Sequence, residues 1–95
     1  MVNGKEAYDY NGPYESPLLN LREMTHGNYP DTARMSQFLK HYLREQPGWE
    51  KLSAGQQESL DMIVVKIARI LSGDPNEKDH WLDIAGYASL VSGRA

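Results

Sequence analysis

The stretch "SAGQQESLDMIVVKIARILSG", residues 53–73, decides the fold. It opens with a capping box, because Ser53 can cap a helix and Gln56 stands at the third helical position. Large apolar side chains then recur at the spacing of one wide helical face: Leu60, Ile63, Val64, Ile67, Ile70 and Leu71. Gly73, with Pro75 after it, stops the pattern, so the stretch predicts an amphipathic helix that ends near residue 72.

Similar signals predict a helix on either side of this one. Start and stop residues frame two earlier helices: Ser16 and Gly27 for residues 17–25, and Asp31 as the cap and Pro47 as the stop for residues 32–45. A last helix is expected over residues 77–92, and no segment has the alternation typical of a strand. The sequence therefore predicts an all-α fold, a compact bundle of three main helices plus a short N-terminal helix.

Length and charge limit the class of protein. Ninety-five residues make one small domain, and a chain this short often gains stability by self-association, so we expect a homo-oligomer. A net charge of -3 with scattered basic residues argues against direct DNA binding, and no apolar run is long enough for a membrane span. We expect a cytoplasmic protein with a tyrosine-rich arm over residues 1–14 and a single helical domain over residues 15–95.

Two carboxylate pairs are the candidate metal ligands. Glu58 and Asp61 lie three residues apart on the less apolar side of the central helix, and Asp79 and Asp83 lie one turn apart on the last helix. Carboxylate oxygens suit Mg²⁺, but antiparallel helices bring these four together only if they cross suitably or a second subunit contributes. The alternative is that all four are solvated polar positions, some of them paired with Arg69 or Lys66.

Four basic residues are the candidates for phosphate binding. Lys66 and Arg69 lie beside the polar face of the central helix and could steady phosphates. For Lys66 we favour the alternative, a lysine that snorkels from the helix flank. His26 and His80 complete the set. The alternatives are a simple helix-joining loop around His26 and a cap or surface position for His80.

Several pieces of residues 26–91 together resemble a known family: "ARMSQFLK", "KIARILSGDP" and "DIAGYA". The chain resembles a small protein of bacteriophages and prophages that looks like a shortened relative of the MazG-like, all-α nucleotide pyrophosphohydrolases. The resemblance implies a helical fold and Mg²⁺-dependent cleavage of nucleoside triphosphates. Glu58 and Asp61 match the first carboxylate pair of that family and Asp83 matches its final aspartate, while His80 stands where its second glutamate is expected and Asp79 lies one position earlier.

Three functions follow from these observations. The first is a phage-type accessory protein that binds a nucleotide with Mg²⁺, with catalysis left open by the incomplete carboxylate motif. The second is a non-catalytic phage protein that binds a host protein or sequesters a signalling nucleotide to counter host defence. The third is a structural helical subunit.

Overall fold

All the regular structure is helical in the computed structural model, which describes residues 17–93. Its elements are α1 (Pro17–His26), α2 (Tyr29–Arg44), the 3-10 helix η1 (Pro47–Lys51), α3 (Ala54–Ser72) and α4 (Lys78–Val91). The all-α prediction is thus confirmed, while the expected Ser16 cap and the arm over residues 1–14 lie outside the described residues. Within residues 17–93, no helix is long and apolar enough to cross a membrane.

Local capping sets the helix ends. The predicted capping box of α3 is present, because Ser53 Oγ accepts the Gln56 N–H at 3.1 Å and Gln56 Oε1 accepts the Ser53 N–H at 2.9 Å. The predicted stop at Gly73 is also confirmed, since its N–H donates to the Arg69 carbonyl at 2.8 Å. Both bonds satisfy backbone groups that a helix end leaves without partners.

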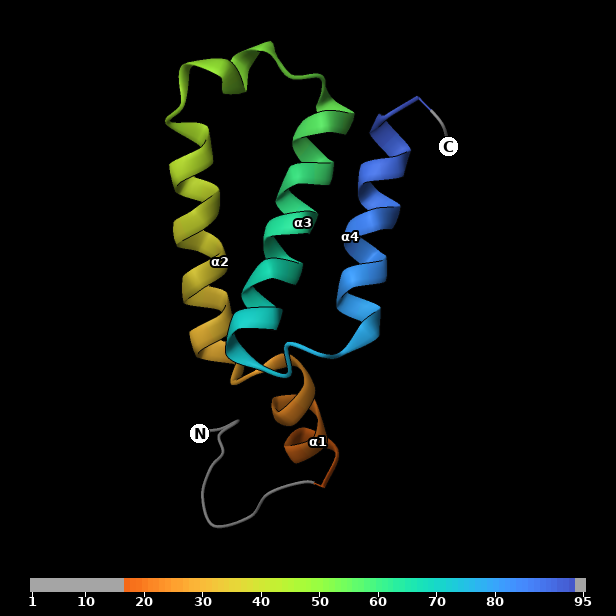
Figure 1. The fold of residues 1–95 in the computed structure, drawn as a ribbon. Coiled ribbons are helices and arrows are strands. Elements are labelled where there is room, and N and C mark those ends of the chain that lie inside the picture. The colour runs from red at the N-terminus through yellow and green to blue at the C-terminus, as the bar shows by residue number, and fades with distance from the viewer. Residues whose placement is uncertain (1–16, 94–95) are drawn as a thin grey trace.

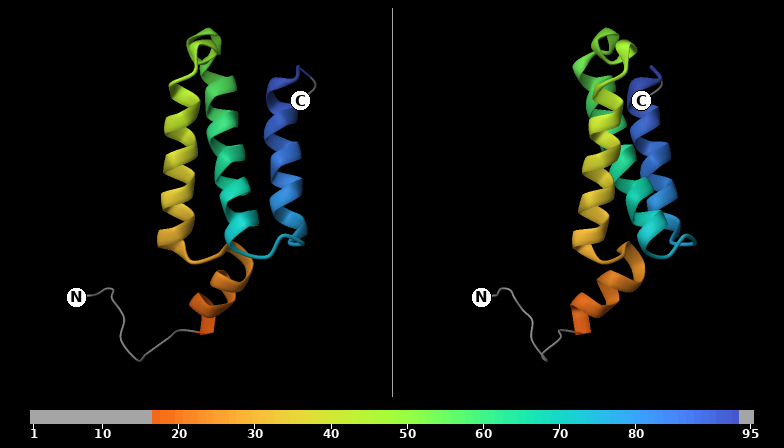
Figure 2. Two further views of the ribbon diagram at one scale, coloured as in Figure 1. Left: turned by 60° about the vertical axis from the view of Figure 1, so that its left-hand side comes forward. Right: turned by 90° about the vertical axis from the view of Figure 1, so that its left-hand side faces the viewer.

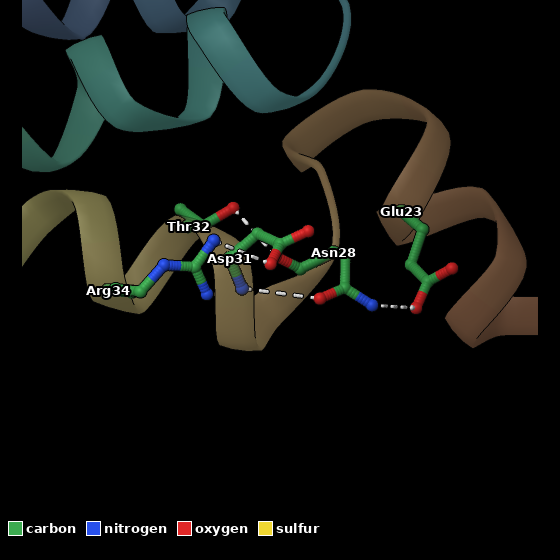
Figure 3. Close-up of polar contacts among 5 residues, drawn as sticks. All are labelled: Glu23, Asn28, Asp31, Thr32 and Arg34. Carbon is green, nitrogen blue, oxygen red and sulfur yellow. Dashed lines mark hydrogen bonds and ion pairs between the residues drawn. The ribbon is translucent and has the colours of Figure 1, made fainter.

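The cap of α2 differs from the prediction, and η1 was not predicted at all. Asn28, not Asp31, caps α2: the Asn28 side chain accepts the Asp31 N–H at 3.2 Å (Figure 3). The helix starts earlier because Pro30 needs no acceptor in the first turn, which leaves Asp31 inside the helix, paired with Arg34 at 2.9 Å. Beyond α2, η1 carries Trp49 under the guanidinium of Arg44, 4.7 Å from the ring centre.

The three long helices form one layer. Figure 1 shows α2, α3 and α4 side by side, with α3 in the middle and each helix antiparallel to the next; the left panel of Figure 2 shows the same order. Only α3 has a long neighbour on both sides, so little of the layer is enclosed. Val64 and Ala68, both on α3, are the only buried apolar side chains within residues 17–93.

A tight junction holds α1 across one end of the layer. Gly27 takes a left-handed conformation with φ of +87°, and a Cβ there would lie 2.8 Å from the Ser72 carbonyl oxygen. A Cβ on Gly73 would overlap the Thr25 carbonyl oxygen, and that oxygen accepts the Asp74 N–H at 3.1 Å. Because neither glycine has a side chain, the backbones at the C-terminal ends of α1 and α3 are in direct contact. This contact fixes the position of α1 at the end of the layer, next to α2 and α3.

Candidate functional site

A cavity of about 390 Å³ lies where α1 meets α2 and α3. This volume falls within the range of about 300–1,000 Å³ that is usual for small-molecule sites. Residues of all three helices line it: Leu19, Arg22, Glu23, His26, Gly27, Tyr29, Thr32, Ala33, Ser36, Gln37, Lys40, Val65 and Arg69. We call this cavity the basic pocket, because its charged lining is mostly cationic.

Three cations in the basic pocket have no acidic partner among the residues that the structure describes. Arg22, Lys40 and Arg69 line the cavity, one from each of the three helices, and none of them forms an ion pair within residues 17–93. Glu23 is the one carboxylate in the lining, and Asn28 Nδ2 donates to it at 3.5 Å (Figure 3). The pocket therefore presents an excess of positive charge in a partly enclosed space, which favours an anionic ligand.

A histidine pair supports the inner end of the pocket. His80 is buried, with 1% of its surface exposed, and its Nε2 lies 3.2 Å from the Thr25 carbonyl and 3.3 Å from His26 Nδ1. A carbonyl oxygen only accepts, so we place the proton on His80 Nε2, from which it can also reach an unprotonated His26 Nδ1.

The environment of His26 keeps its ring neutral. Burial lowers the pKa of His26 below its usual 6.5, and the positive charges of Arg69, Arg22 and Lys66, together with His80, lower it further. Arg69 and Arg22 line the same pocket as His26. The lowered pKa of the ring is therefore a second sign that cations crowd this site.

Two of the four predicted phosphate-binding residues, His26 and Arg69, line the basic pocket. Lys66 and His80 do not. Lys66 is buried and pairs with Asp83 at 3.0 Å, so the alternative of a lysine that snorkels to the surface is wrong. The cap or surface position considered for His80 is also wrong, because α4 packs against α3 through this side of the helix and presents the ring to Thr25.

The four predicted metal ligands do not gather in one chain. Asp61 accepts two hydrogen bonds from Arg44, at 2.9 and 2.7 Å, and Asp83 pairs with Lys66, which confirms the alternative that Lys66 pairs with one of the carboxylates. Glu58 and Asp79 are exposed. Within residues 17–93, no group of three or more acidic, histidine or cysteine side chains could hold a metal ion. The Mg²⁺ site stays a prediction that a single chain does not test.

Sequence reasoning missed Arg22 and Lys40. Both belong to helices that were predicted, but neither stands in a motif or in a periodic pattern with Arg69. The signal exists only in three dimensions, because it is the convergence of three cations from three helices that makes them a site.

A comparison with family models gives one match: the model described as a domain of unknown function, DUF6378, matches residues 16–95. No curated protein and no solved structure matches the chain.

Proposed function

The chain belongs to the DUF6378 family, and we propose that it binds a nucleotide through its phosphates in the basic pocket. One observation carries the proposal: Arg22, Lys40 and Arg69, which form no ion pair within residues 17–93, converge on a cavity of ligand size. Cations close together repel one another and gain from a shared counter-ion, and a chain of phosphates is a small-molecule anion with enough charge to contact all three.

The lining also offers contacts for the rest of a nucleotide. Arginine can donate two parallel hydrogen bonds to a phosphate, which fixes its orientation. Tyr29 borders the pocket with 74% of its surface exposed, so its ring is available to stack on a base. Gln37 and Ser36 supply amide and hydroxyl groups that could hydrogen-bond to base or sugar.

The resemblance to MazG-like enzymes supports the same ligand class, with Mg²⁺ as a companion of the phosphates. Mg²⁺ keeps several of its waters and commonly bridges to phosphate oxygens through only one or two carboxylates. We propose binding as the activity, because Asp61 and Asp83, which the resemblance assigns to the metal, are engaged by Arg44 and Lys66. Sequestration of a signalling nucleotide, one form of the second hypothesis from the sequence, needs no more than this.

Isothermal titration tests the proposal. ATP, AMP, adenosine and inorganic triphosphate are titrated into the full chain, each with and without Mg²⁺. We expect saturable binding that strengthens with phosphate number and is absent for adenosine. If inorganic triphosphate binds with the same affinity as ATP, the base makes no contribution and the ligand is a phosphate chain. If none of the phosphate compounds gives heat, the proposal is refuted.

Variants locate the ligand. Arg69→Gln and Arg22→Gln should each weaken ATP binding by roughly ten- to a hundredfold, since a charge-assisted hydrogen bond contributes about 1.5–3 kcal/mol. Arg34→Gln is the matched control, because Arg34 lies on α2 outside the lining and pairs with Asp31. An equal loss in Arg34→Gln would show general charge attraction instead of a site.

A further inference from the structure

The face of the layer opposite the basic pocket is apolar on all three long helices. On α3, Val65 and Arg69 face the pocket, and the 100° step of a helix places Leu60, Ile67 and Leu71 about half a turn away from them. We call this side of the layer the flat face.

The two outer helices continue the flat face. On α2, Ala33 and Gln37 line the pocket, and the same helical step turns Met35 and Tyr42 to the other side. On α4, the ion pair of Asp83 with Lys66 fixes the pocket side. The flat face is therefore built by these residues: Met35, Phe38 and Tyr42 of α2, Leu60, Ile67 and Leu71 of α3, and Trp81, Ala85 and Ala88 of α4.

Much of the flat face is uncovered. The exposed fractions are 68% for Phe38, 57% for Tyr42, 66% for Leu71 and 54% for Trp81. Trp81 Nε1 donates to the Pro75 carbonyl at 2.8 Å, so the polar edge of its ring is already satisfied. An uncovered apolar surface that spans three helices is a mark of an interaction site in a water-soluble chain.

Few apolar side chains are fully buried in a single chain, and most of the others that pack between the helices keep part of their surface exposed. Two buried apolar side chains, Val64 and Ala68, are all that residues 17–93 enclose. Domains of this size need most of their apolar side chains removed from water, or else association, to offset the conformational entropy of folding.

We propose that the flat face is the interface of a homodimer, in which a second copy of the chain stacks its own flat face on this one to give two packed layers of helices. The area suits this occupant. Aromatic side chains bury about 150–250 Å² each, so Phe38, Tyr42 and Trp81 together offer roughly 270–450 Å², about a third to a half of the ~800 Å² that one partner supplies to a standard interface. Leu60 and Leu71 add further apolar area.

Charge also favours a second copy. The nine residues that define the flat face carry no charge. Asp31 lies one turn before Met35 on the same side of α2, at the start of the helix, and is paired with Arg34. Around a twofold axis each residue meets the same surface on the partner, so a charge near the centre would face its like or be buried unpaired. A face without charge near its centre meets this condition. The dimer leaves both basic pockets open to solvent on its outer sides.

The predicted Mg²⁺ ligands lie on the side of the layer away from the proposed dimer interface. Asp83 is on the pocket side through its pair with Lys66, and the helical step places Glu58 and Asp79 on that side as well. Stacking through the flat face keeps these carboxylates away from the partner. This dimer therefore does not assemble the four predicted ligands from two chains.

Sedimentation velocity of the full chain tests the interface. The chain has a mass of 10.8 kDa, and we expect the wild type to sediment as a species of twice that mass at micromolar concentrations. Tyr42→Asp and Leu71→Lys should each raise the dissociation constant at least tenfold. Leu82→Lys is the matched control, because Leu82 is 57% exposed but lies on the outer edge of α4, away from the flat face.

Thermal melts cover the case in which a variant fails to fold. For a dimer, the wild-type melting temperature rises with protein concentration. A wild type that stays monomeric, with a melting temperature independent of concentration, overturns the proposal. Dissociation caused by Leu82→Lys, with Tyr42→Asp and Leu71→Lys still dimeric, also overturns it, because the interface would then be the edge of α4.

Discussion

Removing Asp83 should destabilise the protein much more than removing its partner Lys66. The Lys66 side chain is 11% exposed, whereas the Asp83 side chain is 49% exposed, and the two meet at 3.0 Å. In Asp83→Ala the ammonium group stays within the layer without its counter-ion. In Lys66→Met the aspartate is left half in water, where it remains hydrated, and a methionine of similar length fills the space.

The burial of the pair sets the size of the effect. Breaking a fully buried pair costs about 3–5 kcal/mol, and water reaches this one through the aspartate, so we expect about 2 kcal/mol for Asp83→Ala. In a domain of this size such a loss lowers the melting temperature by roughly 8–16 °C. Lys66→Met should cost less than about 1 kcal/mol, and the double variant should recover most of the loss.

The assay is thermal denaturation followed by circular dichroism, for the wild type, both single variants and the double variant. All four are melted at one protein concentration, because association would shift the midpoints. An Asp83→Ala midpoint within about 2 °C of the wild type, or a double variant that loses the sum of the two single losses, would refute the reasoning. The double variant is also the better protein in which to test whether metal binding needs Asp83. It lacks the Asp83 carboxylate, and it leaves no buried ammonium group without a counter-ion.

Three further outcomes follow from the fold. Gly73→Ala should destabilise the chain by about 1–3 kcal/mol in urea unfolding, because the new methyl group overlaps the Thr25 carbonyl and must push α1 from α3. Ser53→Ala should cost about 1 kcal/mol in the same assay, because the capping box of α3 loses its acceptor. For His26, the folded pKa is below the unfolded value of 6.5, so the unfolded chain takes up the proton first and stability falls as pH drops below about 6.5; the urea midpoint of His26→Gln should fall less between pH 7.5 and pH 5.5.

Helix positions followed from the sequence because their signals are local. A capping box or a stop glycine acts within a few residues, so Ser53, Gln56 and Gly73 could be assigned without any tertiary information. The cap of α2 was missed by three residues because Asn28 and Asp31 are both good caps, and the Pro30 between them decided the choice.

Burial and pairing could not be predicted in the same way. A lone histidine at the start of α4 gives no sign that it will be buried, and His80 is enclosed because α4 packs against α3 and the end of α1 lies against the ring. Lys66 and Arg69 lie three residues apart on α3 and look alike in sequence. Lys66 is neutralised by Asp83, whereas Arg69 lines the pocket and forms no ion pair in the described part of the chain. That difference depends on where α1 and α4 lie.

The same ion pair constrains how Mg²⁺ could act. A metal ion bound at Asp83 would compete with Lys66, whose ammonium lies 3.0 Å from the Asp83 carboxylate, and it would leave that buried ammonium without its counter-ion and close to a second cation. A nucleotide removes this obstacle, because its phosphates can accept hydrogen bonds from Lys66 while they coordinate the metal. Lys66 lies close enough to the basic pocket to lower the pKa of His26 there. We therefore expect Mg²⁺ to bind only when a nucleotide is present. In isothermal titration, heat from Mg²⁺ alone binding at Asp83 would contradict this expectation, because it would show that the ion pair of Lys66 and Asp83 opens without a nucleotide.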